Sequence, residues 1–310
     1  IRNVFICQYK NTTAIDYFCS IMSIVKLTAL IADYWKMDGG VAFGVVPKSL
    51  WTKVYPEDTD NLINICTRCL LIETENRKIL VDTGMGNKRG DKYYAYKYRT
   101  GTGGIAEQLH NISINPEEIT DVVFTHLHDD HVGGATELDK DGNLKLIFEN
   151  ASYWCSESHW KWSEYSNKRE AAAYFTDNLN PIKESGRLNL IKESGNWLDG
   201  IEFRIFNGHT RGQLIPLIRK ADQTYVFAGD FIPSKAHIPL PYVPAVDIEP
   251  LLTLTEKESF LEEALENQYI LIFEHDFYNE ACQLINTEKG VAAGETRSEE
   301  RRVGKECRSR

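Results

Sequence analysis

Short apolar runs, each bounded by polar residues, glycine or proline, recur along most of the chain. Runs of this length are typical of β-strands that are buried on at least one face. They predict strands over residues 24–34, 62–73, 78–82, 121–125, 145–149, 201–206, 213–219, 223–229 and 269–273.

Longer segments between and after these runs predict helices over residues 103–111, 156–178 and 254–267. The last of these opens with Thr255-Glu-Lys-Glu, which resembles a capping box. The pattern by itself indicates a mixed α and β chain. No repeat or long linker interrupts it, so we expect a single domain over residues 22–296.

The two ends differ from the rest of the chain. Residues 297–310 are nearly all polar, with six basic and three acidic side chains, and resemble translated sequencing-adapter DNA more than a solvated basic tail. We expect this segment to be an artefact. Residues 1–21 are interpreted as upstream read-through, with Met22 as the true start. Residues 14–35 contain apolar stretches, but Asp16, Lys26 and Asp33 interrupt them, so neither a membrane span nor a signal peptide is predicted.

Composition favours an enzyme acting on a small molecule. The 310 residues are 42% hydrophobic and 26% charged, which is enough for a sizeable core. The net charge of −10 repels polyanions and argues against a nucleic-acid partner. The seven cysteines are scattered, which fits a reducing compartment, and we expect a cytoplasmic protein. Cys66 and Cys69 have zinc-knuckle spacing, but they lack a second pair and are read as strand residues.

Chemically, the most informative segment is the run Thr125-His-Leu-His-Asp-Asp-His131. Three of the chain's eight histidines fall within it. The alternative is a polar loop with chance histidines. In an extended segment residues i and i+2 point to the same side, so His126 and His128 can face one metal ion. The following turn can direct Asp130 and His131 towards a second ion, and imidazole and carboxylate ligands suit zinc.

This run resembles the signature of the metallo-β-lactamase-fold hydrolase superfamily. Further motifs follow predicted strands in the order that family shows. They are Asp82-Thr-Gly84, Gly208-His209-Thr210, Gly229-Asp230 and Glu274-His275-Asp276. Taken singly, His209 or His275 would more often be a polar residue at a strand end, and Asp230 could cap a turn. The resemblance implies an α/β fold, a four-layer αββα sandwich with its metal ions at one edge between the sheets.

The resemblance also implies a ligand set for two divalent ions, expected to be zinc. His126, His128 and His209 would hold one ion, Asp130, His131 and His275 the other, and Asp230 would be shared. Two ions about 3.5–4 Å apart activate a bridging water and polarise a substrate carbonyl. Asp82 would orient the metal loop without binding metal.

Residues 37–56 are similar to an N-terminal segment of the quorum-quenching lactonase branch, as are residues 230–237. In the first segment, Phe43 and Trp51 are candidates for gripping an acyl chain, or they fasten the loop to the core. A second aromatic group could form a wall of the pocket, although core packing is expected for most of its members, which are Trp154, His159, Trp160 and Trp162.

We therefore expect hydrolysis of a lactone or ester, with N-acyl homoserine lactones as the expected substrates. That branch has a tyrosine three positions after the bridging aspartate, where this chain has Pro233. Asp130 and His237 are the candidate proton donors to the leaving group, with a structural role as the alternative for His237. A membrane partner is not expected, and a homodimer is left open.

Rival functions share much of the same ligand pattern. The site could cleave phosphotriesters, other esters or β-lactams, although β-lactamases of this fold usually lack an aspartate at the position of Asp230. A mononuclear iron dioxygenase is a further alternative, which two metal ions per chain would exclude. His128 disfavours the flavodiiron class. A binding module with a decayed site is disfavoured because the ligand set is complete.

Overall fold

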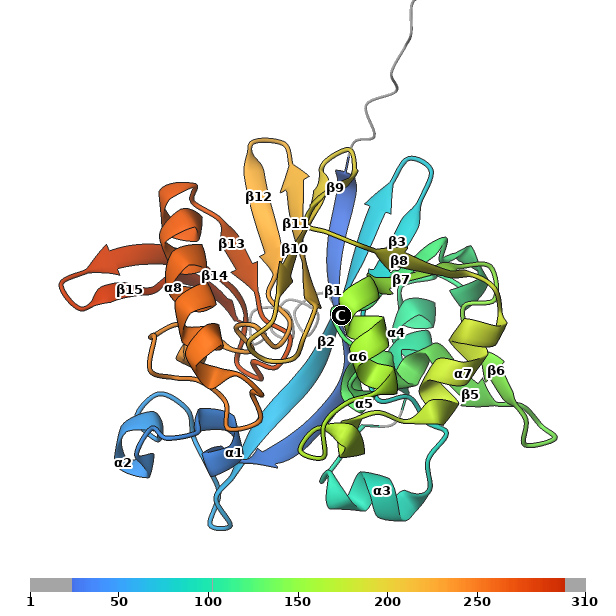
Figure 1. Cartoon of the computed structure of the whole chain (residues 1–310), viewed down its shortest axis with the longest axis horizontal. Coiled ribbons are helices and arrows are strands. Elements are labelled where there is room, and N and C mark those ends of the chain that lie inside the picture. The colour runs from blue at the N-terminus through green and yellow to red at the C-terminus, as the bar shows by residue number, and fades with distance from the viewer. Residues whose placement is uncertain (1–23, 102, 299–310) are drawn as a thin grey trace, which may run out of the picture.

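The computed structural model describes residues 24–101 and 103–298. Two β-sheets face each other and helices cover their outer faces, which gives four layers in the order α, β, β, α (Figure 1). The predicted α/β sandwich is therefore confirmed.

The first sheet has six strands in the order β1-β2-β3-β4-β7-β8. Its long antiparallel pair is β1 and β2, and strands β3, β4, β7 and β8 run parallel to one another. The bounds are Ile24–Asp38 for β1, Leu62–Thr74 for β2, Lys78–Val81 for β3, Asp121–Val123 for β4, Ser152–Ser156 for β7 and Leu188–Ile191 for β8.

The second sheet has seven strands in the order β15-β14-β13-β12-β11-β10-β9. Only β12 and β13 pair in parallel within it. The bounds are Gly195–Leu198 for β9, Ile201–Phe206 for β10, Gln213–Lys220 for β11, Gln223–Phe227 for β12, Ile270–Ile272 for β13, Asn279–Thr287 for β14 and Gly290–Ser298 for β15. A separate hairpin joins β5, Thr136–Leu138, to β6, Leu144–Leu146.

The helices are short except for the last. Their bounds are Gly39–Phe43 for α1, Lys48–Trp51 for α2, Asp91–Tyr96 for α3, Gly104–Asn111 for α4, Asp129–Val132 for α5, Glu157–Glu164 for α6, Thr176–Glu184 for α7 and Pro250–Glu266 for α8. Single 3-10 turns cover Pro116–Glu118, Gly133–Ala135, Ala171–Ala173 and Lys235–His237. Within the described part of the chain, no helix combines the length and apolarity needed to cross a membrane.

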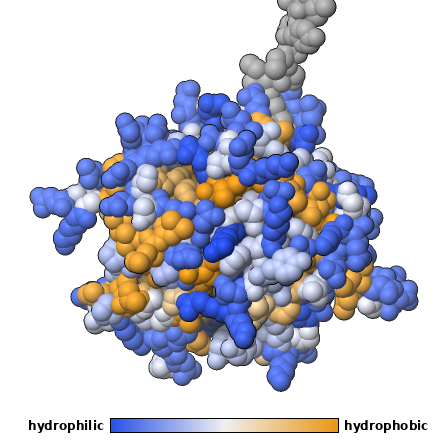
Figure 2. Space-filling view, in the orientation of Figure 1, coloured by the Kyte–Doolittle hydropathy of each residue, from blue (hydrophilic) through white to orange (hydrophobic). Residues whose placement is uncertain are grey.

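Successive side chains of β2 pack alternately into two different hydrophobic clusters, one on each face of the first sheet. Cys69 and Leu71 pack in the cluster under α4, α6 and α7, whereas Leu70 and Ile72 pack against the second sheet. This is the period-2 pattern of a strand that is buried on both faces. Helix α8 covers the other sheet through Phe260 and its neighbours. Figure 2 shows the molecule from the same side as Figure 1. Most of the surface seen there is hydrophilic, and apolar residues gather on the side of α8.

Two of the predicted helices were placed wrongly. Residues 156–178 hold α6 and only the first three residues of α7, because the segment between the two helices folds irregularly around Asn167, whose Oδ1 accepts from Arg169 N and Glu170 N. Helix α8 begins at Pro250, where a proline favours the first turn. The Thr255 motif lies inside that helix, where its hydroxyl donates to Leu251 O.

The predicted strand over residues 145–149 is the short β6, and the sequence pattern missed β5, β7, β8, β9, β14 and β15. Strand β15 also bears on the predicted domain boundary. Arg297 and Ser298 pair with Ala281 and Asn279 of β14, so a boundary at residue 296 falls inside this strand. The interpretations of residues 1–21 and 299–310 lie outside the described residues, and a single domain stays our proposal.

Candidate metal centre

The predicted ligands all follow the ends of strands that meet at one edge of the sandwich. His126 and His128 come after β4, and Asp130 and His131 lie on α5 directly behind them. His209, Asp230 and His275 follow β10, β12 and β13 of the opposite sheet. Because the two sheets face each other, these loops bring histidines that are up to 149 positions apart into one cluster.

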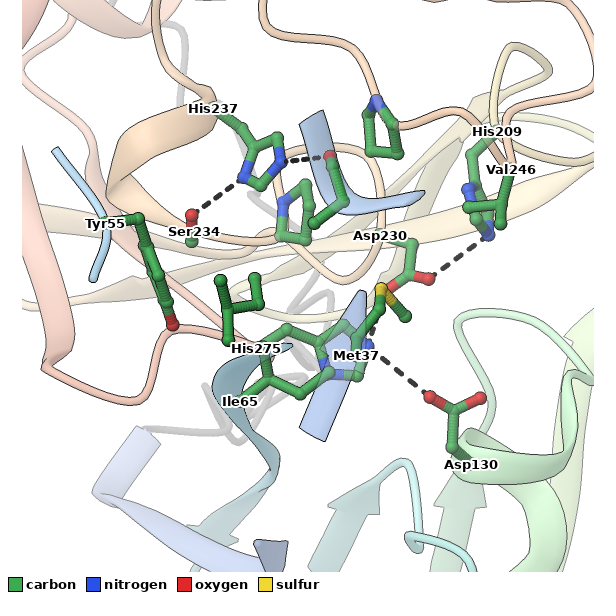
Figure 3. A pocket seen from close by; sticks show the side chains of 14 residues that line it. Met37, Tyr55, Ile65, Asp130, His209, Asp230, Ser234, His237, Val246 and His275 are labelled. Carbon is green, nitrogen blue, oxygen red and sulfur yellow. Dashed lines mark hydrogen bonds and ion pairs between the residues drawn. The ribbon is translucent and has the colours of Figure 1, made fainter. Parts of the chain in front are cut away.

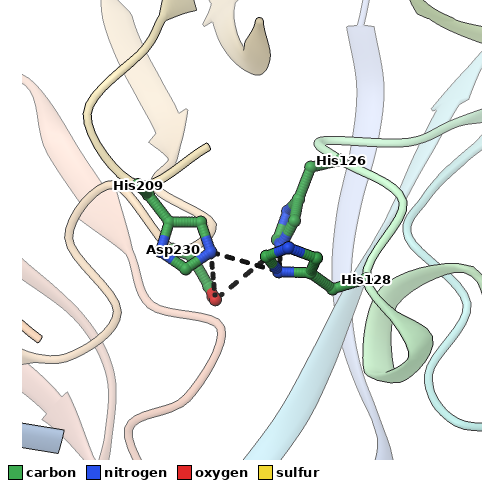
Figure 4. Close-up of side chains that lie close together, drawn as sticks. All are labelled: His126, His128, His209 and Asp230. Atoms are coloured by element: carbon green, nitrogen blue, oxygen red, sulfur yellow. Dashed lines mark hydrogen bonds and ion pairs between the residues drawn. The ribbon is translucent and has the colours of Figure 1, made fainter. Parts of the chain in front are cut away.

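The first donor group contains His126, His128, His209 and Asp230, whose facing atoms lie within 4.8 Å of one another (Figure 4). His126 Nε2 is 2.9 Å from His128 Nδ1, and His128 Nδ1 is 3.3 Å from His209 Nε2. Zinc–nitrogen bonds of about 2.0–2.1 Å in a tetrahedral site place neighbouring donors about 3.3 Å apart. The spacing of these three nitrogens therefore fits one zinc-sized ion.

The second donor group contains Asp130, His131 and His275. His131 Nε2 is 3.3 Å from His275 Nε2, and each of these nitrogens is 3.7 Å from an oxygen of Asp130. These separations again suit a single ion with nitrogen and oxygen ligands.

Asp230 lies between the two groups and turns one oxygen towards each. Its Oδ2 is 3.2 Å from His209 Nε2 and 3.8 Å from His126 Nε2. Its Oδ1 is 2.8 Å from His275 Nε2 and 3.4 Å from His131 Nε2. A carboxylate in this position can bridge two cations, which is the role predicted for it.

Every imidazole in the two groups has a hydrogen-bond partner on its other nitrogen. Such partners fix the orientation of a ligand ring and raise its basicity. They are Thr125 Oγ1 at 3.0 Å for His126, Glu170 Oε1 at 2.8 Å for His128, Asp82 Oδ2 at 3.1 Å for His131, Asp247 Oδ1 at 2.9 Å for His209, and Cys66 O at 2.7 Å for His275.

Asp82 contacts the loop that carries His126 and His131 from behind. It accepts from Thr125 N at 2.8 Å and from Thr125 Oγ1 at 2.6 Å, in addition to His131. Glu274 approaches the same nitrogen of His131, and burial raises its pKa to about 8. Asp82 and Glu274 thus lie beside His131 in a fully buried cluster, on the far side of its ring from the other ligands.

The acid–base properties of the rings are consistent with binding of cations. Burial holds the pKa of His126 well below its usual range, and it also lowers the pKa of His128, so both are neutral ligands. For His275, burial is outweighed by Asp230, Glu274 and Asp130, which raise the pKa to about 9. A metal ion among those carboxylates would replace the proton, the exchange expected when metal binds a histidine site.

Two connected spaces open beside the donor groups. An inner pocket of about 50 Å³ is lined by apolar side chains, including Met37, Ile65 and Val246, together with Tyr55 (Figure 3). A wider mouth of about 570 Å³ leads outward. Asp130, His209 and Asp230 line both spaces, so the two donor groups lie where they join.

The structure does not support the predicted substrate contacts of Phe43 and Trp51. Phe43 is fully buried and Trp51 is 2% exposed, and neither lines the inner pocket or the mouth. Their rings stack 5.1 Å apart and fasten the α1–α2 segment to the core. Gly39 has to be small here, because a Cβ would lie 2.3 Å from the Trp51 ring. Fastening of the loop to the core is therefore the better interpretation of both aromatic rings.

His237 lies at the wall of the inner pocket with both ring nitrogens engaged. Nε2 donates to Ala42 O at 2.9 Å, and Nδ1 faces Ser234 Oγ at 2.7 Å (Figure 3). The ring stacks on Phe43 with centroids 4.9 Å apart, and burial lowers its pKa to about 4. A neutral imidazole with no free N–H is a poor proton donor, so the geometry favours the structural alternative for His237.

Sequence reasoning missed the supporting residues Glu170, Asp247 and Glu274. Glu274 adjoins His275, so its position within the Glu-His-Asp motif could have indicated it. Glu170 and Asp247 lie in irregular segments, and they reach His128 and His209 across 42 and 38 positions. The sequence carries no local signal for those two contacts.

Comparison with known proteins agrees with this geometry. Residues 67–275 match the model of the metallo-beta-lactamase superfamily. An N-acyl homoserine lactonase from Bacillus cereus is 25% identical over 232 residues, which cover 71% of this chain and 85% of that protein.

Among solved structures, a probable metal-dependent hydrolase from Staphylococcus aureus has 30% sequence identity and a TM-score of 0.81, covering 89% of this chain and 98% of that one. The dizinc quorum-quenching lactonase AidC has a TM-score of 0.72 at 20% identity, over 88% of this chain and 97% of its own. At that identity the likeness shows the fold alone. The family match covers both donor groups from β4 to His275, and the chain belongs to the metallo-beta-lactamase superfamily.

Proposed function

We propose that this protein is a dinuclear metal-dependent hydrolase that opens lactone rings, with N-acyl homoserine lactones as the first substrates to test. The observation that carries the proposal is the position of Asp230, which turns one oxygen to each of two separate donor groups. The lactonase from Bacillus cereus supports the choice of a lactone as substrate.

The donor groups fit two divalent ions, of which zinc is the proposed metal. When bound, the ions would supply an activated water and polarise the lactone carbonyl. The remaining roles belong to the chain. The buried partners of the five imidazoles keep the rings in place, which is the preorganisation that such a site requires.

Ring opening requires a hydroxide to add to the carbonyl carbon, the bond from that carbon to the ring oxygen to break, and a proton to reach the departing oxygen. Asp130 is the proposed proton carrier, because it lines both the inner pocket and the mouth. His237 is a poor candidate because both of its ring nitrogens already have hydrogen-bond partners. A cytoplasmic location and a homodimer stay predictions from the sequence.

The second donor group separates this proposal from a mononuclear dioxygenase. A one-iron site needs no second cluster of the kind formed by Asp130, His131 and His275. Elemental analysis of the purified chain distinguishes the two, since we expect about two metal ions per chain.

The activity is tested by pH-stat hydrolysis of N-acyl homoserine lactones, a simple ester, a phosphotriester and a β-lactam. Lactone opening should be the fastest of these reactions. Asp230→Asn should lower lactone turnover by at least about a hundredfold and reduce the metal content. Asp222→Asn, at an exposed position in the turn after β11, is the matched control and should behave like the native chain. Unchanged lactone turnover in Asp230→Asn would refute the proposal.

A further inference from the structure

The mouth of the site is lined by charged residues of both signs, and its carboxylates already have partners. Asp129 receives the Tyr93 hydroxyl and lies against Lys97. Asp130 and Asp230 face the histidines of the two donor groups. Each of these three carboxylates therefore lies against a lysine or a histidine of the chain itself.

Glu170 is the fourth carboxylate that lines the mouth, and it too has partners within the chain. It faces His128, and it accepts from Trp162 Nε1 at 2.7 Å, from the Tyr174 hydroxyl at 2.5 Å and from Thr210. Glu170 thus meets several donors of the chain itself, and its carboxylate is not open to a ligand in the mouth.

The ammonium group of Lys97 is different. It lies at the end of α3, 5.1 Å from the centre of the Trp35 ring and 3.4 Å from Asp129 Oδ2. Within the described residues, Lys97 Nζ forms an ion pair with Asp129 but no well-aligned hydrogen bond. The Lys97 side chain is only 23% exposed. An ammonium group has three N–H donors, so Lys97 keeps donors for a ligand in the mouth.

Arg169 faces the mouth from the segment between α6 and α7. It donates one Nη2 bond to Ala245 O, and it has no carboxylate partner among residues 24–101 and 103–298. The rest of its planar guanidinium keeps donor groups that suit a carboxylate or phosphate. Lys97 and Arg169 therefore line the mouth from separate segments, and each keeps N–H donors that a ligand could use.

We propose that Lys97 and Arg169 form a binding site for an anionic group on the substrate, a carboxylate or a phosphate. This inference rests on the proposed lactone hydrolysis and narrows it. The ring would lie at the donor groups, with its anionic substituent in the mouth. The inner pocket, at about 50 Å³, takes only a small apolar part.

Binding is tested first, with a ligand that the enzyme cannot open. Cyclopentanone carboxylate and its primary carboxamide have nearly the same shape and differ in charge. Isothermal titration of the zinc-loaded full chain should show the carboxylate binding on the order of tenfold more tightly than the amide. This ratio should fall as salt rises from about 50 to about 500 mM.

The variants Lys97→Met and Arg169→Met should each reduce this ratio severalfold. Lys92→Met and Lys168→Met remove the same charge from exposed neighbours on the same segments and should keep it. A ratio near one in the native chain would overturn the proposal. So would a high ratio that neither Lys97→Met nor Arg169→Met changes, because the carboxylate would then bind elsewhere, for example at the metal ions.

Turnover provides an independent arm. Butyrolactone with a carboxylate on the ring carbon next to the ring oxygen is compared with its carboxamide by kcat/KM. The acid should be preferred on the order of tenfold, and Lys97→Met should lower that preference. If no lactone is opened, the proposed function fails, and the titration still decides whether the mouth binds anions. If the amide is opened as fast as the acid, the inference fails and the lactonase proposal stands.

Discussion

Glu170 Oε1 lies 2.8 Å from His128 Nε2, on the opposite side of the ring from the nitrogen that faces His126 and His209. Burial alone would raise the pKa of Glu170, but hydrogen bonds from His128, Thr210 and Tyr174 outweigh it and lower the pKa. Glu170 is therefore a carboxylate that polarises His128 towards the proposed metal ion.

We predict that Glu170→Gln weakens binding of one metal ion by about 10- to 100-fold. The amide has no charge to polarise His128, and its NH2 group would face the donors of Trp162 or of Tyr174 and Thr210. Competition with a coloured zinc chelator measures the affinity, and circular dichroism checks the fold. Glu164→Gln, on the exposed side of α6, should retain the native affinity. Equal affinities in both variants would show that Glu170 does not support the ligand.

A second prediction concerns His159, which joins the two loops that carry the first donor group. Its Nε2 accepts from Leu127 N at 2.8 Å, and its Nδ1 donates to Arg211 O at 2.7 Å. Burial lowers its pKa to about 3, so the ring stays neutral and supplies one donor and one acceptor.

His159→Ala should therefore lower the affinity for the first metal ion by at least about tenfold, because the two loops lose their link. His159→Gln keeps one donor and one acceptor and should recover part of that affinity. The exposed His110→Ala is the control. If the alanine variant unfolds more easily but binds zinc as the native chain does, His159 has only a packing role.

The sequence indicated which side chains gather at the site because each follows a short buried strand and each belongs to a local motif. It failed where a contact depends on segments without a regular pattern. Glu170 lies in the irregular stretch between α6 and α7, which the sequence had suggested was a continuous helix. Phe43 and Trp51 show the same limit, since an apolar ring looks alike in sequence whether it faces a ligand or the core.

The hairpin of β14 and β15 was missed for a different reason. Many of its side chains are exposed, and few apolar residues mark a buried face. Pairing with β13 places this hairpin at the edge of the second sheet, and that neighbour was not apparent from the local sequence. Edge strands of this kind give weak periodic signals.

A third prediction concerns Gly134, which lets the Asp82-Thr-Gly84 loop approach the metal loop. Its N–H donates to Gly84 O at 2.7 Å, and an added Cβ would lie 2.0 Å from Thr83 O. Gly134→Ala should cost about 2 kcal/mol or more of unfolding free energy and weaken zinc binding, because backbone must move. Gly90→Ala, where no atom lies within 4 Å of the new Cβ, should change stability by less than about 0.5 kcal/mol. Urea denaturation measures both, and equal effects would contradict the argument.

The last prediction uses the buried, neutral His237 as a source of acid sensitivity. Its pKa is lowered to about 4, whereas an unfolded chain binds that proton near the ordinary value of about 6.5. Between these values the unfolded state holds more protons than the folded state, so stability falls as the pH falls. From about pH 7.5 to about pH 5.0 the stability that His237 contributes falls by about 2 kcal/mol.

The variant His237→Gln removes this titration, so its stability deficit relative to the native chain should shrink by that amount at the lower pH. Urea unfolding of both proteins in the presence of a chelator gives the difference free of metal binding, and the other histidines cancel because both chains share them. A deficit that stays constant between the two pH values would mean that folding does not lower the pKa of His237, and the proton-donor role would then return to consideration.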